Sequence, residues 1–501
     1  MVSKLTDSKQ NKKVFCLIIT GLFFFANLYL VFCHESWRDE AQAWLIARDL
    51  SISGIFYQMR FEGHPCLWHL LLVPLTRLGL PYATMKILSL IIVTASVFVL
   101  LRYSSFHPAV RVILVFSAAY MYFMPCISRS YCLIPLLMAV AAIIFNTKTK
   151  KPVVFGAILF LLVQTHVYLL GFCFAVCLVW LWDVFFEFRA DKDIRKLFGN
   201  GLGLLLPLLS ALLFYIQVAT SLESSSSANP NLTSNPLYSL WSTSVTSFST
   251  LFGGLNSKAA TIVFICYIFT LVLVFLPLLL SKSKCEHSKA VKSIFILVLG
   301  VLFQVAFFAF FYNGSGMLQK ALIIFYIILF SIWIICASIE NKAFVRNANL
   351  LIAAFAIAIS IGNYPMVAKD VVYQYSASET AANLIRETVP PEEPIFSCNY
   401  PIDSAIIPYL PEYKFYTAGS FEEFTYVTWS DSFLGTRDYQ DFLYQLWYQY
   451  PDKEGFYVLT SSDNVTNADG TAATLIFETR EDGFKTTIDE AIYKLYYVRV
   501  K

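Results

Sequence analysis

The chain of 501 residues is 57% hydrophobic and 14% charged, and its formal net charge is +3. Because a soluble protein has about 25% charged residues, this composition indicates that the bilayer is the main solvent of the chain. The small net charge, without a basic stripe interleaved with aromatic residues, excludes a nucleic-acid partner.

Apolar runs of about 20 residues recur from Val14 to Val367, and each is long enough to cross the hydrocarbon core as a helix. The first run, Val14 to Cys33, is too long for the core of a signal peptide and is followed by no small-residue cleavage site. Lysines precede it, so the positive-inside rule places the N-terminus in the cytoplasm and His34 outside. We therefore expect a multi-pass protein of the plasma membrane.

Basic clusters in the later loops alternate as the same rule requires, if Tyr82 to Leu101 forms the second span and the third span ends at Ile127. This pattern predicts about eleven transmembrane helices, with the last near Leu350 to Met366 and an extracytoplasmic tail after it. The Ser-rich segment Ser221 to Ser257 is then an external loop.

Two segments of the first external loop are predicted to lie along the membrane surface. Pro65 to Leu80 is apolar, but counting it as a span would place nearly all later basic clusters outside, against the rule. Asp39 to Leu50 carries Trp44 and Leu45 on one face and charged residues elsewhere, as an interfacial helix does.

From about Val371 the tail mixes charges, proline pairs and strand-like runs, which predicts a small external α/β domain of roughly 130 residues. The predicted fold class is a polytopic α-helical membrane protein with two external juxtamembrane helices and this C-terminal domain. Its parts are a transmembrane module over residues 1–370, with the first external loop at 34–81, and an extracytoplasmic domain over residues 371–501. In the tail, helices are predicted over Ser378 to Glu387, with a serine cap, and Asp438 to Tyr450, and strands over Ile395 to Ser397, Phe456 to Thr460, Thr474 to Phe477 and Ala491 to Val500.

The first external loop contains the acidic pair Asp39-Glu40 soon after the first span, and Glu62 follows in the same loop. A carboxylate just outside a span can act as a base toward an acceptor hydroxyl, and burial among aromatic residues would raise its pKa toward the working pH. The same residues also fit a structural role, in which Asp39 caps the following helix and Glu40 lies in its first turn. One carboxylate can serve as both a cap and a base.

A second polar cluster, Ser128-Arg129-Ser130-Tyr131, lies at the outer ends of the third and fourth spans. An arginine there can bind a phosphate through two hydrogen bonds. The alternative is an arginine that snorkels to the interface beside an anchoring tyrosine. His166 and Tyr168 lie near the outer end of the fifth span, where a histidine either serves a site or hydrogen-bonds to a neighbouring helix.

Lys86 opens the second span and Lys320 precedes the tenth, both on the outer side, so each either snorkels or helps to neutralise a lipid phosphate. His34, His64 and His69 suggest a metal, but no motif such as H-E-x-x-H is present, and no metal site is predicted. No cofactor is assigned, and a divalent cation is left as an alternative.

The order of these parts resembles the GT-C superfamily of membrane glycosyltransferases, in particular the relatives of protein O-mannosyltransferase and aminoarabinose transferase. Lys86 stands where relatives often have arginine, and Gly63-His64 replaces the pair that precedes proline in the aminoarabinose branch. The resemblance covers about six spans and rests on Asp39-Glu40, His64-Pro65, Lys86, Arg129-Ser130-Tyr131 and Thr165-His166-Val167-Tyr168.

The resemblance implies a transferase that moves a sugar, with inversion, from a polyprenyl-phosphate donor to a hydroxyl of a glycan, lipid or protein acceptor at the outer face of the membrane. Asp39 would be the general base, and Glu40 would act beside it. By the same resemblance the donor phosphate would be bound by Arg129, Lys86, His166 and Lys320, and sugar or acceptor contacts would come from Glu62, His64, Tyr131 and Tyr168.

Other classes of protein make different predictions. A polysaccharide polymerase or ligase that uses a lipid diphosphate carrier would have arginine and histidine in its large late loops, and Ser221 to Ser257 contains neither. A transporter would have charged residues in the middle of its spans and two similar halves. A structural or receptor role of the tail would let Asp39 tolerate neutral substitution. Aromatic residues of the tail suit either sugar stacking or a domain core, namely Trp429, Tyr439, Trp447 and Tyr448.

Overall fold

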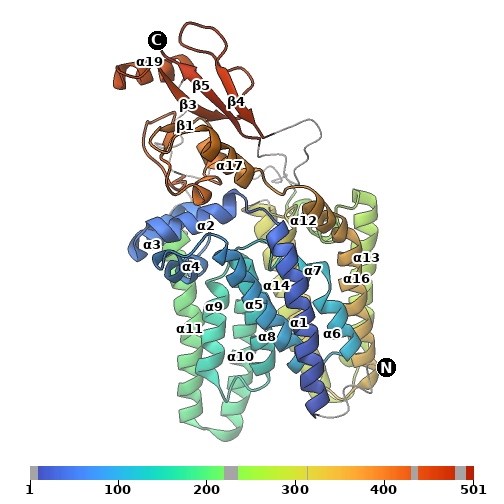
Figure 1. Ribbon diagram of the computed structural model, residues 1–501. Coiled ribbons are helices and arrows are strands. Elements are labelled where there is room, and N and C mark those ends of the chain that lie inside the picture. Colours follow the sequence, from blue (N-terminus) through green and yellow to red (C-terminus); the bar gives the residue numbers. More distant parts are fainter. Residues whose placement is uncertain (1–8, 219–234, 313, 430–437, 480–491) are drawn as a thin grey trace. The chain divides into compact units, whose positions relative to one another are not determined.

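The computed structural model describes residues 9–218, 235–312, 314–429, 438–479 and 492–501, which form two compact units (Figure 1). The first unit contains the described residues within 1–29, 87–220 and 225–367, and the second contains those within 30–86 and 368–501. The predicted first external loop therefore packs in one unit with the tail. The predicted boundary at residue 370, between a transmembrane module and an extracytoplasmic domain, stays a prediction.

Eight helices in the described part of the chain are long and apolar enough to cross a membrane. Many of their large apolar side chains are exposed, such as Phe25 at 69% and Ile262 at 63%, as expected of residues that face lipid. The chain is thus a multi-pass membrane protein. The eight helices are α1 (Lys9–Cys33), α5 (Thr84–Tyr103), α10 (Leu170–Asp191), α11 (Ile194–Val218), α13 (Ser257–Leu279), α14 (Lys284–Phe310), α15 (Leu318–Cys336) and α16 (Lys342–Val372), and two shorter apolar helices, α8 (Leu133–Phe145) and α9 (Pro152–Val163), accompany them.

The third predicted span is not a continuous helix, which corrects the prediction. Its residues form α6 (Pro108–Val115) and α7 (Ala118–Met121), followed by turns. The Ala118 amide donates to a serine hydroxyl of α16 at 3.1 Å, and the Tyr326 hydroxyl donates to the carbonyl of Ala119 at 3.1 Å. Irregular backbone is tolerated within a membrane where other protein groups satisfy it in this way, and hydropathy does not reveal such partners.

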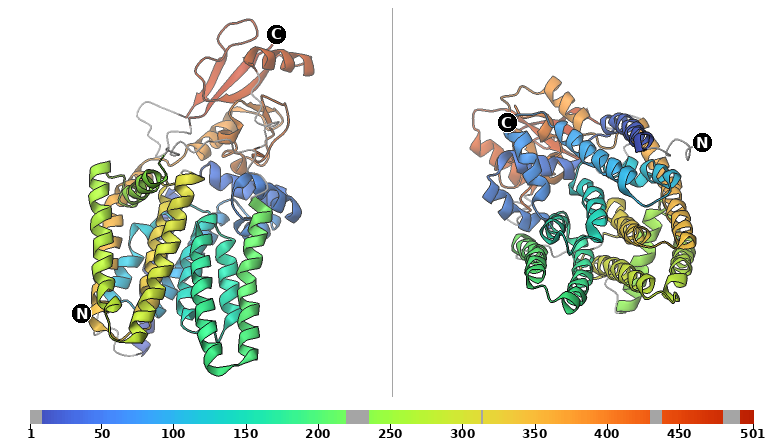
Figure 2. Two further views of the ribbon diagram at one scale, coloured as in Figure 1. Left: turned by 180° about the vertical axis from the view of Figure 1, so that it is seen from behind. Right: turned by 90° about the horizontal axis from the view of Figure 1, so that it is seen from below.

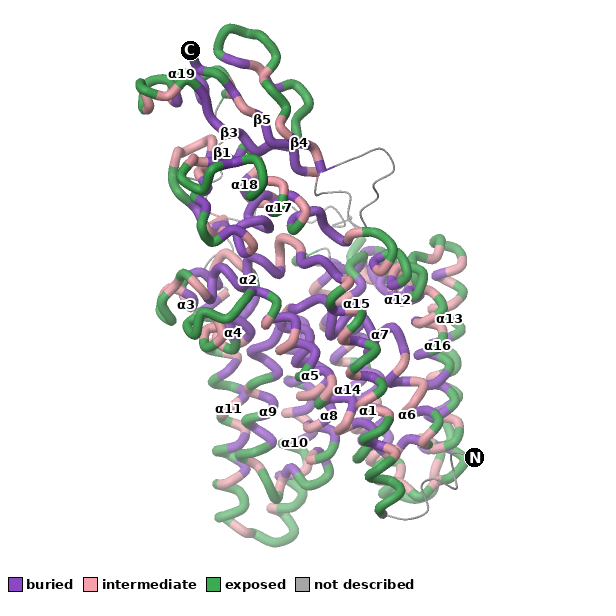
Figure 3. Tube along the Cα trace, viewed as in Figure 1, coloured by how far each residue is buried: buried purple, intermediate pink, exposed green. Residues whose placement is uncertain are grey.

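The core of the first unit is built around α15, which is buried along nearly its whole length (Figure 3). In its most apolar stretch 89% of the residues are buried, against 28% in α11 and in α13. Helix α15 packs on α8, α14 and α12 (Pro236–Leu251). Viewed along the bundle, α9, α10 and α11 lie side by side (Figure 2).

Glycines allow α9 and α11 to approach closely, as small residues often do between membrane helices. A Cβ at Gly203 would lie 2.5 Å from the carbonyl oxygen of Pro152, and a Cβ at Gly156 would lie 2.0 Å from that of Gly203. We expect Gly203→Val to destabilise the protein in detergent by about 1–3 kcal/mol because it overpacks this contact, as measured by thermal unfolding. At Gly201 in the same helix a Cβ would meet nothing within 4 Å, so an equal effect of Gly201→Val would contradict this explanation.

The predicted external loop before α13 contains a helix, α12 (Pro236–Leu251), and residues 219–234 of that loop lie outside the described residues. Asn235 caps the helix by accepting from two backbone amides, and Pro236 occupies its first turn. The many Ser and Thr residues have weak helix propensity, so the sequence suggested a loop. Packing of α12 on α13, α14 and α15 stabilises the helix instead.

The second unit begins with three short helices rather than the predicted two: α2 (Arg38–Asp49), α3 (Ile52–Glu62) and α4 (Leu67–Arg77). Helix α4 has 11 residues, about 16 Å at 1.5 Å per residue, which is shorter than a hydrocarbon core of about 30 Å. Its length agrees with a surface helix. The unpredicted α3 starts at the Ser51 cap and ends at Gly63, whose φ of 69° stops the helix.

The tail folds into a five-stranded sheet of order β2-β1-β3-β5-β4. Strand β1 pairs in parallel with β2 on one side and with β3 on the other. Strand β5 pairs antiparallel with β3 and with β4. Phe442 and Leu446 of α19 pack on Phe396 and Phe456 of the sheet. The elements are α17 (Ser378–Thr388), β1 (Ile395–Ser397), α18 (Tyr400–Asp403), β2 (Phe415–Thr417), α19 (Tyr439–Gln449), β3 (Gly455–Thr460), β4 (Thr474–Glu478) and β5 (Lys494–Arg499).

These elements confirm the predicted α/β character of the tail. Strand β2 was not predicted, and the predicted strand start at Ala491 lies outside the described residues. The predicted serine cap of α17 is wrong, because the N-cap is Ala377, whose side chain cannot accept a hydrogen bond. The Ser378 hydroxyl instead donates to the carbonyl of Ser36 at 2.8 Å, which ties α17 to the first external loop.

Candidate active site

The acidic pair lies in the first turn of α2, but the helix begins one residue earlier than predicted. Its N-cap is Trp37, whose backbone N–H donates to Glu40 Oε2 at 3.2 Å. The alternative that Asp39 caps the helix is therefore wrong. Glu40 is completely buried, whereas the Asp39 side chain is 33% exposed and pairs with Arg38 at 3.3 Å. Of the two carboxylates, Asp39 is the one that is accessible from outside the protein.

A buried histidine links α2 to the end of α16. His34 Nε2 lies 3.1 Å from Glu40 Oε2, and His34 Nδ1 lies 2.8 Å from Asp370 Oδ2. The ring also packs on Tyr375, with ring centroids 4.4 Å apart. Burial alone would lower the pKa of His34, but the two carboxylates outweigh it and raise the pKa to about 9. The two carboxylates therefore favour the protonated form of the His34 ring.

The same residue binds the predicted phosphate ligand Lys86. The buried Lys86 donates from Nζ to the main-chain carbonyl of His34 at 2.6 Å. Next to it, Glu35 accepts from the backbone N–H of Glu379 at 2.5 Å, at the start of α17. Burial raises the pKa of Glu35 to about 7, against the opposing effects of this hydrogen bond and of Lys86. Hydrogen bonds thus connect Lys86, through His34, with Glu40.

Glu62 and His64 lie in the same unit and contact other side chains there. Glu62 accepts from Nε2 of Gln42 in α2 at 2.7 Å and from Nε2 of Gln58 in α3 at 3.2 Å. Gln42 also donates to the carbonyl of Val427 and accepts from its amide, so α2 is tied to the loop after β2. His64 stacks on His69, with ring centroids 5.4 Å apart. Glu62 therefore belongs to a network that holds α2 in place.

The first unit contains the other predicted site residues as a second cluster. Arg129 precedes the short turn that carries Tyr131, and the Tyr131 hydroxyl lies 3.1 Å from His166 Nε2. The ring of His166 stacks on Tyr131 and on Tyr168, with centroids 5.1 and 4.1 Å apart. The charge of Arg129 acts on the Tyr168 hydroxyl. The structure therefore brings these four predicted residues together.

Lys320 joins this second cluster through a tyrosine. Its Nζ donates to the Tyr312 hydroxyl at 3.0 Å and lies 4.3 Å from the centroid of that ring. Tyr312 in turn is close enough to act electrostatically on Tyr168. The cluster therefore combines two cations with hydroxyl and imidazole groups, a set that suits an anionic headgroup.

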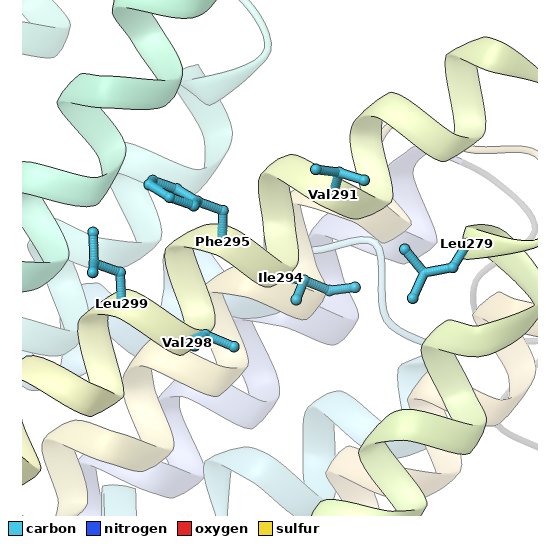
Figure 4. Close-up of a pocket in the computed structure, with 6 residues that line it drawn as sticks. All are labelled: Leu279, Val291, Ile294, Phe295, Val298 and Leu299. Atoms are coloured by element: carbon cyan, nitrogen blue, oxygen red, sulfur yellow. The ribbon is translucent and has the colours of Figure 1, made fainter.

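Two apolar grooves lie along the spans of the first unit. One, of about 390 Å³, is formed mainly by α14 with Leu279 of α13, and Val291, Phe295 and Val298 line it (Figure 4). The other, of about 610 Å³, lies between α13 and α16. The predicted site residues, all of which the structure describes, line neither groove. Because their linings are mainly apolar, these grooves suit lipid chains rather than a catalytic site.

Metal-binding groups are not gathered in the described residues, where no three or more His, Cys, Asp or Glu side chains are arranged to hold a metal ion. The contacts of Asp370, Tyr375 and Gln42 were not predicted from the sequence, and His34 was considered there only as a metal ligand. Asp370 and His34 are 336 positions apart, so no local pattern joins them. The one available signal was an acidic residue at the end of the last predicted span.

The described residues form a helical membrane bundle, a loop after α1 that carries the acidic pair, and a small α/β fold in the tail. The chain is similar over 98% of both chains to ArnT from Cupriavidus metallidurans bound to undecaprenyl phosphate, with 12% identity and a TM-score of 0.57. The apo state of that protein is similar over 97% of both chains, with 13% identity and a TM-score of 0.47. No protein-family model and no curated protein matches the chain. The predicted resemblance is confirmed at the level of the fold.

Proposed function

We propose that this protein is a glycosyltransferase that moves a sugar from a polyprenyl-phosphate donor to an acceptor hydroxyl at the outer face of the membrane. One observation carries the proposal: a partly exposed carboxylate, Asp39, lies in one compact unit with the buried Lys86, and hydrogen bonds connect Lys86 through His34 with Glu40, the neighbour of Asp39. The likeness in fold to an ArnT structure bound to undecaprenyl phosphate supports this class of donor.

In the proposed reaction, Asp39 takes the proton of the acceptor hydroxyl while the hydroxyl oxygen attacks the anomeric carbon of the donor sugar. The bond between the anomeric carbon and the phosphate oxygen breaks, and its electron pair leaves on the polyprenyl phosphate. Attack from the opposite face inverts the anomeric centre. Lys86 stabilises the charge that develops on the phosphate, because a preorganised cation in a water-poor site favours the transition state.

The remaining roles are proposed separately for each unit. In the first unit, Arg129, His166 and Lys320 are proposed to bind phosphate, and Tyr131 and Tyr168 to contact sugar. In the second unit, Glu62 and His64 are proposed to contact sugar or acceptor. The basic clusters of the loops support a cytoplasmic N-terminus and an extracytoplasmic tail.

Binding of the carrier headgroup tests the proposed donor class without any knowledge of the acceptor. Farnesyl phosphate, a short soluble analogue, should raise the unfolding temperature of the purified protein, because a ligand that binds only the folded state stabilises it. Farnesol has the same chain without the phosphate and serves as the control. An equal shift with farnesol, or a larger one with farnesyl diphosphate, would contradict the proposed donor.

A further inference from the structure

His34 is placed to do more than fill the core of the second unit. Its ring is completely buried, and each of its two nitrogens faces a carboxylate oxygen, one of Glu40 and one of Asp370. A neutral imidazole can donate from only one nitrogen, so two ionised carboxylates at the two nitrogens favour the imidazolium. Its main-chain carbonyl accepts from Lys86 at 2.6 Å. One residue therefore holds three charged side chains of the second unit.

The cluster places acidic and basic side chains side by side. The His34 ring lies between the carboxyl groups of Glu40 and Asp370, and its main-chain carbonyl accepts from Lys86. Removing one member of such a buried set leaves an uncompensated charge, which is costly. The charged side chains in this neighbourhood include Arg38, Asp39 and Glu40 of α2, Glu35 before it, Lys86 of α5, Asp370 of α16, and Glu379 of α17. The tyrosines that face them are Tyr82, Tyr375, Tyr409 and Tyr493.

We infer that His34 is a positioning residue of the candidate site, whose imidazolium holds the first turn of α2 through Glu40 while its carbonyl holds Lys86. The inference rests on the proposed function. Glu40 accepts both from the Trp37 amide and from His34, so the bond to His34 fixes the residue that starts the helix. Asp39 lies in that turn, two residues after Trp37 and directly before Glu40, so the direction of its carboxylate depends on how the helix starts. Asp370 holds the imidazolium from the other side.

The positioning role requires a protonated ring, which makes it dependent on pH. The pKa of His34 in the folded protein, about 9, is above the ordinary value of 6.5. The stabilisation is therefore complete below pH 6.5 and is lost as the pH rises through about 9. Both the unfolding temperature and the transfer rate of the wild type should fall over this range.

The test compares wild type with His34→Gln and Asp370→Asn, all as full-length protein in proteoliposomes. For His34→Gln we expect kcat to fall by about 10–100-fold with the KM for acceptor nearly unchanged, because substrate does not touch the buried ring. The decline in unfolding temperature near pH 9 should disappear in this variant. For Asp370→Asn, which removes one of the two stabilising carboxylates, the alkaline decline should move to lower pH.

Several outcomes would overturn the inference. It fails if His34→Gln retains the wild-type kcat or the wild-type alkaline decline, or if Asp370→Asn leaves the position of that decline unchanged. The second variant keeps the inference testable should His34→Gln not fold. If the wild type shows the stability decline but transfers no sugar from any polyprenyl-phosphate donor, the proposed function is wrong, and the positioning role falls with it.

Discussion

Replacing Asp39 by asparagine should lower the kcat of sugar transfer by about 10²–10⁴-fold, the usual contribution of a general base. The asparagine side chain keeps the shape of the carboxylate but cannot take the acceptor proton. The ion pair of Asp39 with Arg38 is partly exposed, and such pairs contribute about 0–1 kcal/mol to stability. The unfolding temperature should therefore change little, and the KM for the donor should stay close to that of the wild type.

Asp49 at the other end of α2 provides a matched control. It pairs with the adjacent Arg48 at 2.6 Å and its side chain is 24% exposed, similar to the 33% of Asp39. Asp49→Asn should retain wild-type kcat. Equal losses in the two variants would point to a general electrostatic effect of α2, and full activity of Asp39→Asn would exclude Asp39 as the base.

Replacing Lys86 by methionine should reduce kcat/KM for the donor by about 10²–10³-fold, the size of effect seen when one group that stabilises transition-state charge is removed. Methionine retains the length and apolar character of the side chain but lacks the ammonium. It also removes the bond to the His34 carbonyl, so some loss of stability is expected. The kinetics of transfer should be measured at several donor concentrations, which separates kcat from KM.

Lys86→Arg distinguishes a phosphate contact from a purely structural role. Arginine keeps the positive charge and can bind phosphate through two hydrogen bonds, whereas its planar guanidinium fits the buried lysine position less well. If Lys86 acts on the phosphate, Lys86→Arg should regain most of the activity despite a lower unfolding temperature. If Lys86→Arg instead loses both stability and activity, as expected of Lys86→Met, only a structural role of Lys86 would be supported.

Much of the architecture could be predicted because the bilayer imposes simple rules on length and polarity. A run of apolar residues long enough to cross the membrane must satisfy its backbone internally, so helices such as α13 and α14 follow from hydropathy alone. The broken segment of α6 and α7 could not be predicted in this way. Its backbone depends on partners that lie far along the sequence, including the Tyr326 hydroxyl.

The candidate site was predicted less completely than the fold. The acidic pair, Lys86 and the residues around Arg129 were predicted from residue type and from the predicted side of the membrane, and their roles stay predictions. Two features needed three-dimensional contacts. The N-cap of α2 is Trp37, which has no capping side chain. The Glu40 carboxylate accepts from the Trp37 backbone N–H instead. Asp370 meets His34 only through packing of the tail against the first external loop.

The most direct test of the proposed function is the release of free polyprenyl phosphate by the wild-type protein in proteoliposomes supplied with radiolabelled polyprenyl-phosphate sugars and candidate acceptors. We predict that polyprenyl monophosphate is released in step with sugar transfer to a hydroxyl of the acceptor, with inversion at the anomeric carbon. If the protein consumes no monophosphate-linked donor, or instead releases the diphosphate from diphosphate-linked sugars, the proposed function is wrong.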